Sequence, residues 1–136
     1  MKPLHLTILA LWILTGTTAT FASPSNIGPF IGAWQAVDPE DGSLQTLTIS
    51  RNDDGTAHLL IHDTYFALCN GDRGLGHGTG LLSQAKTMSV SDYRLTCFSS
   101  GISKGGPTTL TLNRNGTLTR ILAPPSPVIT YFRYSR

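Results

Sequence analysis

Two short segments of alternating polar and apolar residues, joined by a tight turn, constrain the fold of this chain most. Thr109-Leu110-Thr111-Leu112 leads into the turn Asn113-Arg114-Asn115-Gly116, and Thr117-Leu118-Thr119-Arg120-Ile121 continues the alternation. Alternation with a period of two places the leucines on one face of a strand. Because Asn-Gly is a strong hairpin signal, the pair predicts an antiparallel hairpin with one apolar face.

The same pattern of β-rich segments and turns recurs along the chain, and no long stretch has the period of a helix. A second hairpin is predicted for residues 44–50 and 56–62, around the turn Asn52-Asp53-Asp54-Gly55. Further strands are predicted at 31–37, 65–69, 80–84, 87–91, 93–98 and 128–134. About eight short antiparallel strands predict an all-β fold, and a small barrel is favoured over the alternative of a β-sandwich because closure removes exposed edges.

The N-terminus has the layout of a secretory signal peptide. Lys2 supplies a positive start, an apolar stretch runs from Leu4 to Leu14, and cleavage is predicted near Ala22. The threonines that follow Leu14 come too soon for the roughly 20 apolar residues of a membrane span. We therefore expect a signal peptide over 1–22, a single domain over 23–136, and a secreted or periplasmic protein that has no membrane contact after cleavage.

Cys69 and Cys97 are the only cysteines of the chain. An oxidising compartment would join them, and the sequence offers neither a CxxC pair nor a nearby third metal ligand. We expect one disulfide, which stabilises the domain by about 3–4 kcal/mol in the chain-entropy model.

Charge gives no reason to expect a nucleic-acid partner. Ten Lys and Arg residues stand against eight Asp and Glu residues, for a formal net charge of +2. Every acid lies between Asp38 and Asp92, and the basic residues beyond are interpreted as a solvated face of the sheet.

Several motifs that resemble catalytic or ligand-binding signatures lack the structure that such chemistry needs. Gly101-Ile102-Ser103-Lys104-Gly105 matches G-x-S-x-G, but a β-rich run follows it instead of a helix, so a flexible loop with an inert Ser103 is predicted. The glycine-rich segment 71–80 opens no helix for a phosphate and is predicted to be a mobile loop, with His77 and Arg73 as possible binding residues.

Metal ligands are not expected either. On a strand, His58 and His62 would lie about 13 Å apart, too far to chelate one ion. The acidic turns at 38–42 and 52–55 do not fit a calcium loop. The sequence thus predicts no catalytic residue, no metal and no cofactor.

Gly32-Ala33-Trp34 at the start of the first strand resembles the G-x-W signature of lipocalins and related calycin barrels. Ser91-Asp92-Tyr93 is similar to the T-D-Y loop of the same barrels. The resemblance implies a reduced lipocalin-like barrel that binds a small apolar molecule or an extracytoplasmic protein. It also implies that Trp34 is a buried plug at the closed end and that the last strand returns beside the first, which would lay Arg133 over the indole.

A second resemblance is to the small periplasmic inhibitors of bacterial metalloproteases. These are signal-bearing eight-stranded barrels with one disulfide and an early G-x-W, and the segment before their barrel enters the protease cleft. Here that segment would be residues 23–30, although Cys69 lies much farther beyond Trp34 than the first cysteine of that family does. The leading prediction is a non-enzymatic secreted binding domain. A protease inhibitor is the first alternative, and a small hydrolase using Ser103 or His77 is the second.

Overall fold

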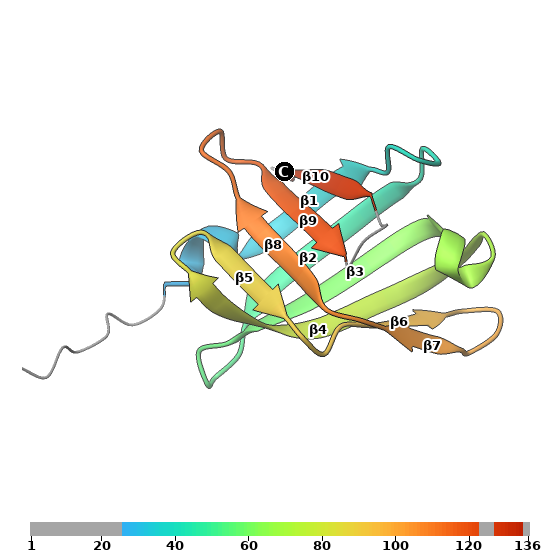
Figure 1. Cartoon of the computed structure of the whole chain (residues 1–136), viewed down its shortest axis with the longest axis horizontal. Helices are drawn as coiled ribbons and strands as arrows, with labels where there is room; N and C mark the ends of the chain where they lie inside the picture. The colour runs from blue at the N-terminus through green and yellow to red at the C-terminus, as the bar shows by residue number, and fades with distance from the viewer. Residues whose placement is uncertain (1–25, 123–126, 135–136) are drawn as a thin grey trace, which may run out of the picture.

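Eight strands of this protein close into an antiparallel β-barrel (Figure 1). The computed structural model describes residues 26–122 and 127–134, so the expected signal peptide and its cleavage point lie outside the described residues. The described residues form two 3-10 helices, η1 (Gly28–Phe30) and η2 (Ala67–Cys69), and ten strands. The strands are β1 (Gly32–Val37), β2 (Leu44–Arg51), β3 (Ala57–Phe66), β4 (Asp72–Gln84), β5 (Thr87–Val90), β6 (Arg94–Cys97), β7 (Ser103–Gly105), β8 (Thr108–Leu112), β9 (Leu118–Leu122) and β10 (Val128–Arg133).

The long strand β4 explains how ten strands make an eight-stranded ring. The ring runs β3-β2-β1-β10-β9-β8-β5-β4, and pairing of β3 with β4 closes it. The edge of β4 that faces away from β3 pairs with β5 from Gly80 to Gln84 and with β6 from Gly74 to His77. The β6–β7 hairpin therefore extends the wall beyond β5 and β8. This closed barrel confirms the predicted all-β fold and rules out the sandwich alternative.

The prediction of a mobile glycine-rich loop at 71–80 is wrong, because residues 72–84 form β4. The glycines serve close packing instead of mobility. A Cβ at Gly74 would lie 2.9 Å from the Phe66 side chain, and a Cβ at Gly78 would lie 2.6 Å from that of Val90. At Gly76 a Cβ would collide with the ring of Tyr93. Alternate glycines thus leave room for the large side chains inside the barrel.

Two smaller predictions are also corrected. The predicted strand at 65–69 ends at Phe66, because η2 and the left-handed pair Asn70 (φ 55°) and Gly71 (φ 85°) reverse the chain there. The predicted flexible loop at 101–105 contains β7, which pairs with β6 through Ser103 and Thr96. In both places the backbone partners decide the structure, and local residue preferences do not.

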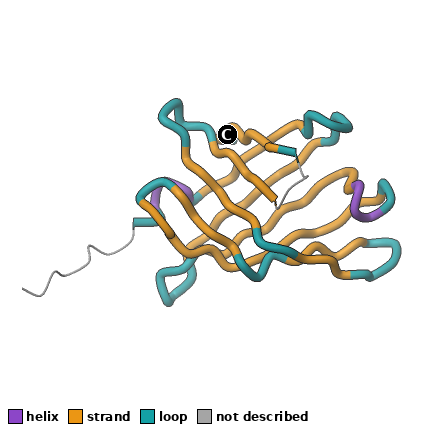
Figure 2. The backbone as a smooth tube through the Cα atoms, in the orientation of Figure 1, coloured by secondary structure: helices purple, strands orange, loops and turns teal. Residues whose placement is uncertain are grey.

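The end of the barrel next to η1 is filled with apolar side chains, and we call it the closed end. Ile27, Phe30 and Trp34 are buried there, and the Trp34 Nε1 donates a 2.9 Å hydrogen bond to the Phe30 carbonyl. The opposite end, which carries the β1–β2 turn and η2, is called the open end (Figure 2).

Arg133 joins η1 to the last strand. Its guanidinium carbon lies 4.2 Å from the Trp34 ring centroid, in the position expected from the sequence. Its Nη1 and Nη2 donate hydrogen bonds of 2.8 and 2.7 Å to the carbonyls of Ile31 and Pro29. Gly32 has φ 136°, and a Cβ there would lie 2.8 Å from the Arg133 Nη1. Glycine is therefore required at position 32 of the G-x-W segment, because a larger residue would collide with the Arg133 side chain.

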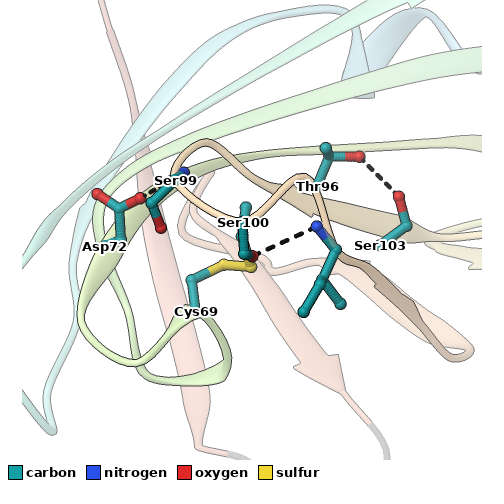
Figure 3. Close-up of a disulfide and its surroundings, with 8 residues drawn as sticks. Cys69, Asp72, Thr96, Ser99, Ser100 and Ser103 are labelled. Atoms are coloured by element: carbon teal, nitrogen blue, oxygen red, sulfur yellow. Dashed lines mark hydrogen bonds between the residues drawn. A yellow bond between two sulfur atoms is a disulfide. The ribbon is translucent and has the colours of Figure 1, made fainter.

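The predicted disulfide between Cys69 and Cys97 is confirmed, with the Cα atoms 5.4 Å apart (Figure 3). It links η2 to β6 at the open end. Beside it, the Asp72 carboxylate accepts a 2.8 Å hydrogen bond from the Ser99 amide. A disulfide is typical of an oxidising, extracytoplasmic compartment. In the described ranges, no helix is long and apolar enough to cross a membrane.

Candidate binding site at the open end of the barrel

A pocket of about 430 Å³ opens into the barrel at the open end. Much of its wall is apolar and comes from η2, β6, β9 and β10. The apolar lining includes Phe66, Leu68, Leu95, Leu122 and Ile129. Its volume lies in the range of sites for small molecules, and a mostly apolar wall with a few polar groups is typical of them.

A second hollow of about 290 Å³ lies beside the first and shares four lining residues with it. The shared residues are Leu68, Tyr93, Leu95 and Leu122. Lys104 and Gly105 of β7 also line this hollow. Among the described strands, β7 pairs only with β6, so the hydrogen-bonded wall is interrupted here.

The strands themselves place polar side chains at the open end. On β2 the inward residues are Gln45, Leu47 and Ile49, all buried, and Gln45 is the one nearest the open end. On β3, buried Asp63 follows Leu59 and Ile61 on the same face. Alternate residues of a strand share a face. The inward face of each of these two strands therefore carries part of the apolar core and, towards the open end, one polar side chain.

Gln45 forms hydrogen bonds with three polar side chains at the open end. Its Oε1 accepts hydrogen bonds of 2.6 Å from the Tyr131 hydroxyl and 3.3 Å from the Arg120 Nη2. Its Nε2 donates a 3.1 Å hydrogen bond to the Asp38 Oδ2. The Asp38 Oδ1 accepts the Glu40 amide at 2.8 Å. Gln45 thus uses both ends of its amide and fixes the positions of its neighbours.

Arg120 is the least satisfied member of the group. It is only 2% exposed, and its Nε and Nη1 have no hydrogen-bond partner among the described residues. Its guanidinium carbon lies 5.9 Å from the ring centroids of both Tyr93 and Tyr131. The Arg120 charge also favours the ionised form of the nearby Tyr93 hydroxyl. Buried donors without acceptors are costly and rare.

Burial shifts the pKa values of three groups around Arg120. Desolvation raises the pKa of Asp63, and the nearby carboxylates of Asp41 and Asp38 add to that rise, while the hydrogen bond from the Tyr65 amide opposes it. Burial also raises the pKa of Tyr93 and Tyr131, against the lowering effect of the Arg120 charge. Both tyrosines are therefore neutral hydroxyls at physiological pH.

The residues that the sequence suggested as possible binding or catalytic groups, Arg73, His77 and Ser103, lie outside the lining of this pocket. Arg73 and His77 are exposed on β4, so they do not form a binding loop. Ser103 is exposed on β7, and its Oγ lies 3.1 Å from the Thr96 Oγ1 (Figure 3). The His62 ring faces Phe98, with 6.2 Å between centroids. The described part of the chain contains no group of three or more His, Cys, Asp or Glu side chains placed to hold a metal.

Gln45, Asp63, Arg120 and Tyr131 were missed by sequence reasoning, although a signal for Arg120 was present. In the segment Leu118-Thr119-Arg120-Ile121-Leu122, the arginine occupies the face that Leu118 and Leu122 define as apolar. A charged residue on a buried face is an informative exception.

The outer face of β1, β2 and β10 carries a shallower hollow of about 480 Å³. Val37, Leu44, Val128 and Phe132 contribute its apolar surface, and Val37 and Phe132 are more than half exposed.

Comparison with known proteins identified no relative of this chain. No protein-family model, no curated protein and no solved structure matches it.

Proposed function

We propose that this protein is a secreted, lipocalin-like binding protein that takes a small, largely apolar molecule into the pocket at the open end. The observation that carries the proposal is the difference in side-chain packing between the two ends of the barrel. Packed side chains occupy the closed end, whereas the open end leaves about 430 Å³ between apolar walls. Protein interiors rarely leave such volumes unfilled, and an apolar pocket with a few polar groups is the usual form of a ligand site.

Displacement of a fluorescent apolar probe tests this proposal. Ala67 is an exposed residue of η2 that lines the pocket, so Ala67→Trp should narrow the entrance and weaken probe binding at least tenfold. Ala85→Trp is the matched control, because Ala85 is exposed in the β4–β5 turn, which lies outside the pocket lining. Equal probe affinities for both variants and the wild type would contradict the proposal.

The lipocalin-like assignment and the secretion are parts of the same proposal. Support comes from the closed barrel with a buried Trp34 and from the disulfide, which an oxidising compartment favours. N-terminal sequencing of the protein recovered outside the cytoplasm tests the secretion. A start at Ser23 is expected, and a retained Met1 would contradict it.

The inhibitor and hydrolase alternatives gain little support from the described residues. Ile27 and Phe30, from the segment expected to enter a protease cleft, are buried under the barrel. Ser103 shares its hydrogen bond with Thr96 instead of a histidine.

A protein partner remains the second candidate, favoured by the outer hollow around Val37 and Phe132. Native mass spectrometry of the protein from its own host distinguishes the two. A retained small molecule supports the first proposal. A defined protein complex that is lost in Phe132→Ser but kept in Ala85→Trp supports the second.

A further inference from the structure

We propose that the ligand of the open-end pocket presents a neutral oxygen acceptor, such as an amide or ketone carbonyl, to Arg120 at its inner end. This inference rests on the proposed binding function and specifies the chemical class of the ligand. It assigns to Arg120 the role of a specificity-determining residue.

The hydrogen-bonding capacity of Arg120 is the first argument. A guanidinium has five N–H donors, one on Nε and two on each Nη. Only the Nη2 has a partner among the described residues, the Gln45 Oε1 at 3.3 Å. The donors on Nε and Nη1 therefore need an acceptor, and Arg120 lines the pocket that would bring one. Leaving buried donors unpaired costs more than the gain from an ordinary hydrogen bond.

Several acceptors around the pocket already have other donors. Gln45 accepts both Arg120 and Tyr131 through the same oxygen. Asp38 accepts Gln45 and the Glu40 amide, and the Asp63 Oδ1 accepts the Tyr65 amide. The protein thus holds Arg120 in place through Gln45 while the donors on its Nε and Nη1 stay unpaired among the described residues. Such a rigid, preorganised donor set is what selects one ligand group over another.

The charges around the pocket decide between a neutral and an anionic acceptor. Asp38, Glu40, Asp41 and Asp63 all line the pocket, against the single cation Arg120, and the neighbouring hollow adds only Lys104. A carboxylate ligand would gain from Arg120 but would be repelled by this excess of negative charge. A carbonyl oxygen meets the donors without adding charge. Leu95, Leu122 and Ile129 then provide an apolar surface for the rest of the molecule.

Three probes of equal chain length separate these contributions. Octanamide has a neutral acceptor, octanoate has a charged one, and octane has none. We expect octanamide to displace the fluorescent probe at neutral pH about tenfold more strongly than octane, because a hydrogen bond to a charged group is lost with octane. We expect octanoate to compete more weakly than octanamide. Equal competition by all three, or strongest competition by octanoate, would overturn the inference but leave the proposed binding function intact.

Variants of Arg120 connect the preference to this side chain. Arg120→Met should abolish the preference for octanamide over octane. Arg114→Met is the matched control, because Arg114 is exposed in the β8–β9 turn and should keep the preference. A preference that persists in Arg120→Met would contradict the inference. Thermal unfolding of each variant establishes that it is folded.

A spectroscopic measurement on the wild type is independent of any variant. The Nε–H resonance of Arg120 should shift in ¹⁵N-edited NMR spectra when octanamide is added, and should not shift in the same way with octane. An unchanged resonance in a complex with bound octanamide would overturn the inference. Failure of all three probes and of the fluorescent probe to bind would instead contradict the proposed function itself.

Discussion

The two ends of the barrel use the same strands for different purposes. At the closed end, the inward residues of β2 and β3 are apolar, namely Leu47, Ile49, Leu59 and Ile61, and none exceeds 1% exposure. Towards the open end, the same faces carry Gln45 and Asp63. The change from apolar to polar along single strands separates the apolar core from the polar part of the open-end pocket lining.

Two arginines make the difference concrete. Arg133, at the closed end, is exposed, lies 4.2 Å above the Trp34 ring and donates to two backbone carbonyls. Arg120, towards the open end, is almost fully buried, lies 5.9 Å from two tyrosine rings and donates only to Gln45 among the described residues. The exposed arginine is well satisfied, and the buried one is not. We therefore expect substitutions at the closed end to affect stability and substitutions around Arg120 to affect binding.

The largest effect is expected for Trp34→Ala. The variant loses a fully buried indole and its hydrogen bond to the Phe30 carbonyl, so the free energy of unfolding should fall by about 3–5 kcal/mol. Urea denaturation measures this change. Phe132→Ala, which removes an aromatic ring that is 64% exposed, is the control and should cost less than about 1 kcal/mol. Similar losses for both variants would contradict the assignment of Trp34 as the plug.

Loss of the disulfide should have the next largest effect. Replacing Cys69 and Cys97 together by Ser frees a loop with a sequence separation of 28 residues, which corresponds to about 3.5 kcal/mol in the chain-entropy model. Urea denaturation of the wild type with and without reductant should give the same difference. An unfolding transition that is insensitive to reductant would contradict this expectation.

The closed end could be predicted from the sequence to a larger extent than the open end. Period-two alternation identified most strands. At the open end the disulfide was also predicted, because the chain has two cysteines and its N-terminal sequence predicts secretion. Trp34 and Arg133 form a pair across β1 and β10, which a returning last strand brings together. These features depend on local patterns and on the closure of the sheet, so the sequence alone contains the necessary signal.

The open end depends on contacts between residues far apart in the chain. Gln45 meets Arg120 and Tyr131 across 75 and 86 residues. Glycines at 74, 76 and 78 suggested a loop, because the space they leave for Phe66, Tyr93 and Val90 is visible only in the folded barrel. Arg120 broke the expected pattern by its position on an apolar face, as Gln45 does on β2 and Asp63 does on β3.

Arg133→Met sharpens the comparison at the closed end. The variant keeps the hydrophobic stem but loses the interaction with the Trp34 ring and the hydrogen bonds to Pro29 and Ile31. Because these contacts are at the surface, we expect a loss of about 1–2 kcal/mol in the free energy of unfolding. The exposed Arg114→Met variant should show no measurable loss in the same denaturation experiment. If Arg133→Met were as stable as that control, the Arg133 contacts between η1 and β10 would contribute nothing to the free energy of unfolding.

A smaller, pH-dependent effect is expected for Asp63→Asn at the open end. Burial raises the pKa of Asp63 in the folded state above its ordinary value near 3.9, so the folded protein binds this proton more tightly than the unfolded chain does. The stabilisation from protonation is therefore complete below pH ~4 and is lost as the pH rises through the folded-state pKa. The wild type and Asp63→Asn should be equally stable at low pH, and the variant should be more stable at neutral pH. Thermal unfolding of both proteins across the pH range tests this. The prediction is contradicted if the stability of Asp63→Asn relative to the wild type falls as the pH rises from low to neutral.

The smallest change in stability is expected for Arg120→Met, in spite of the burial of this side chain. Methionine keeps much of the apolar stem and removes a guanidinium whose Nε and Nη1 have no described partner. The substitution does not leave Gln45 unpaired, because the Tyr131 hydroxyl still donates to its Oε1 at 2.6 Å. Replacing a buried, poorly compensated charge by an apolar residue of similar size is often neutral or stabilising, and this gain offsets the lost contacts with the two tyrosine rings. We therefore expect the free energy of unfolding, measured without ligand, to stay within about 1 kcal/mol of the wild type. A loss as large as that of Trp34→Ala would mean that Arg120 is structural, like the closed end, and would remove the physical basis for assigning it to a ligand.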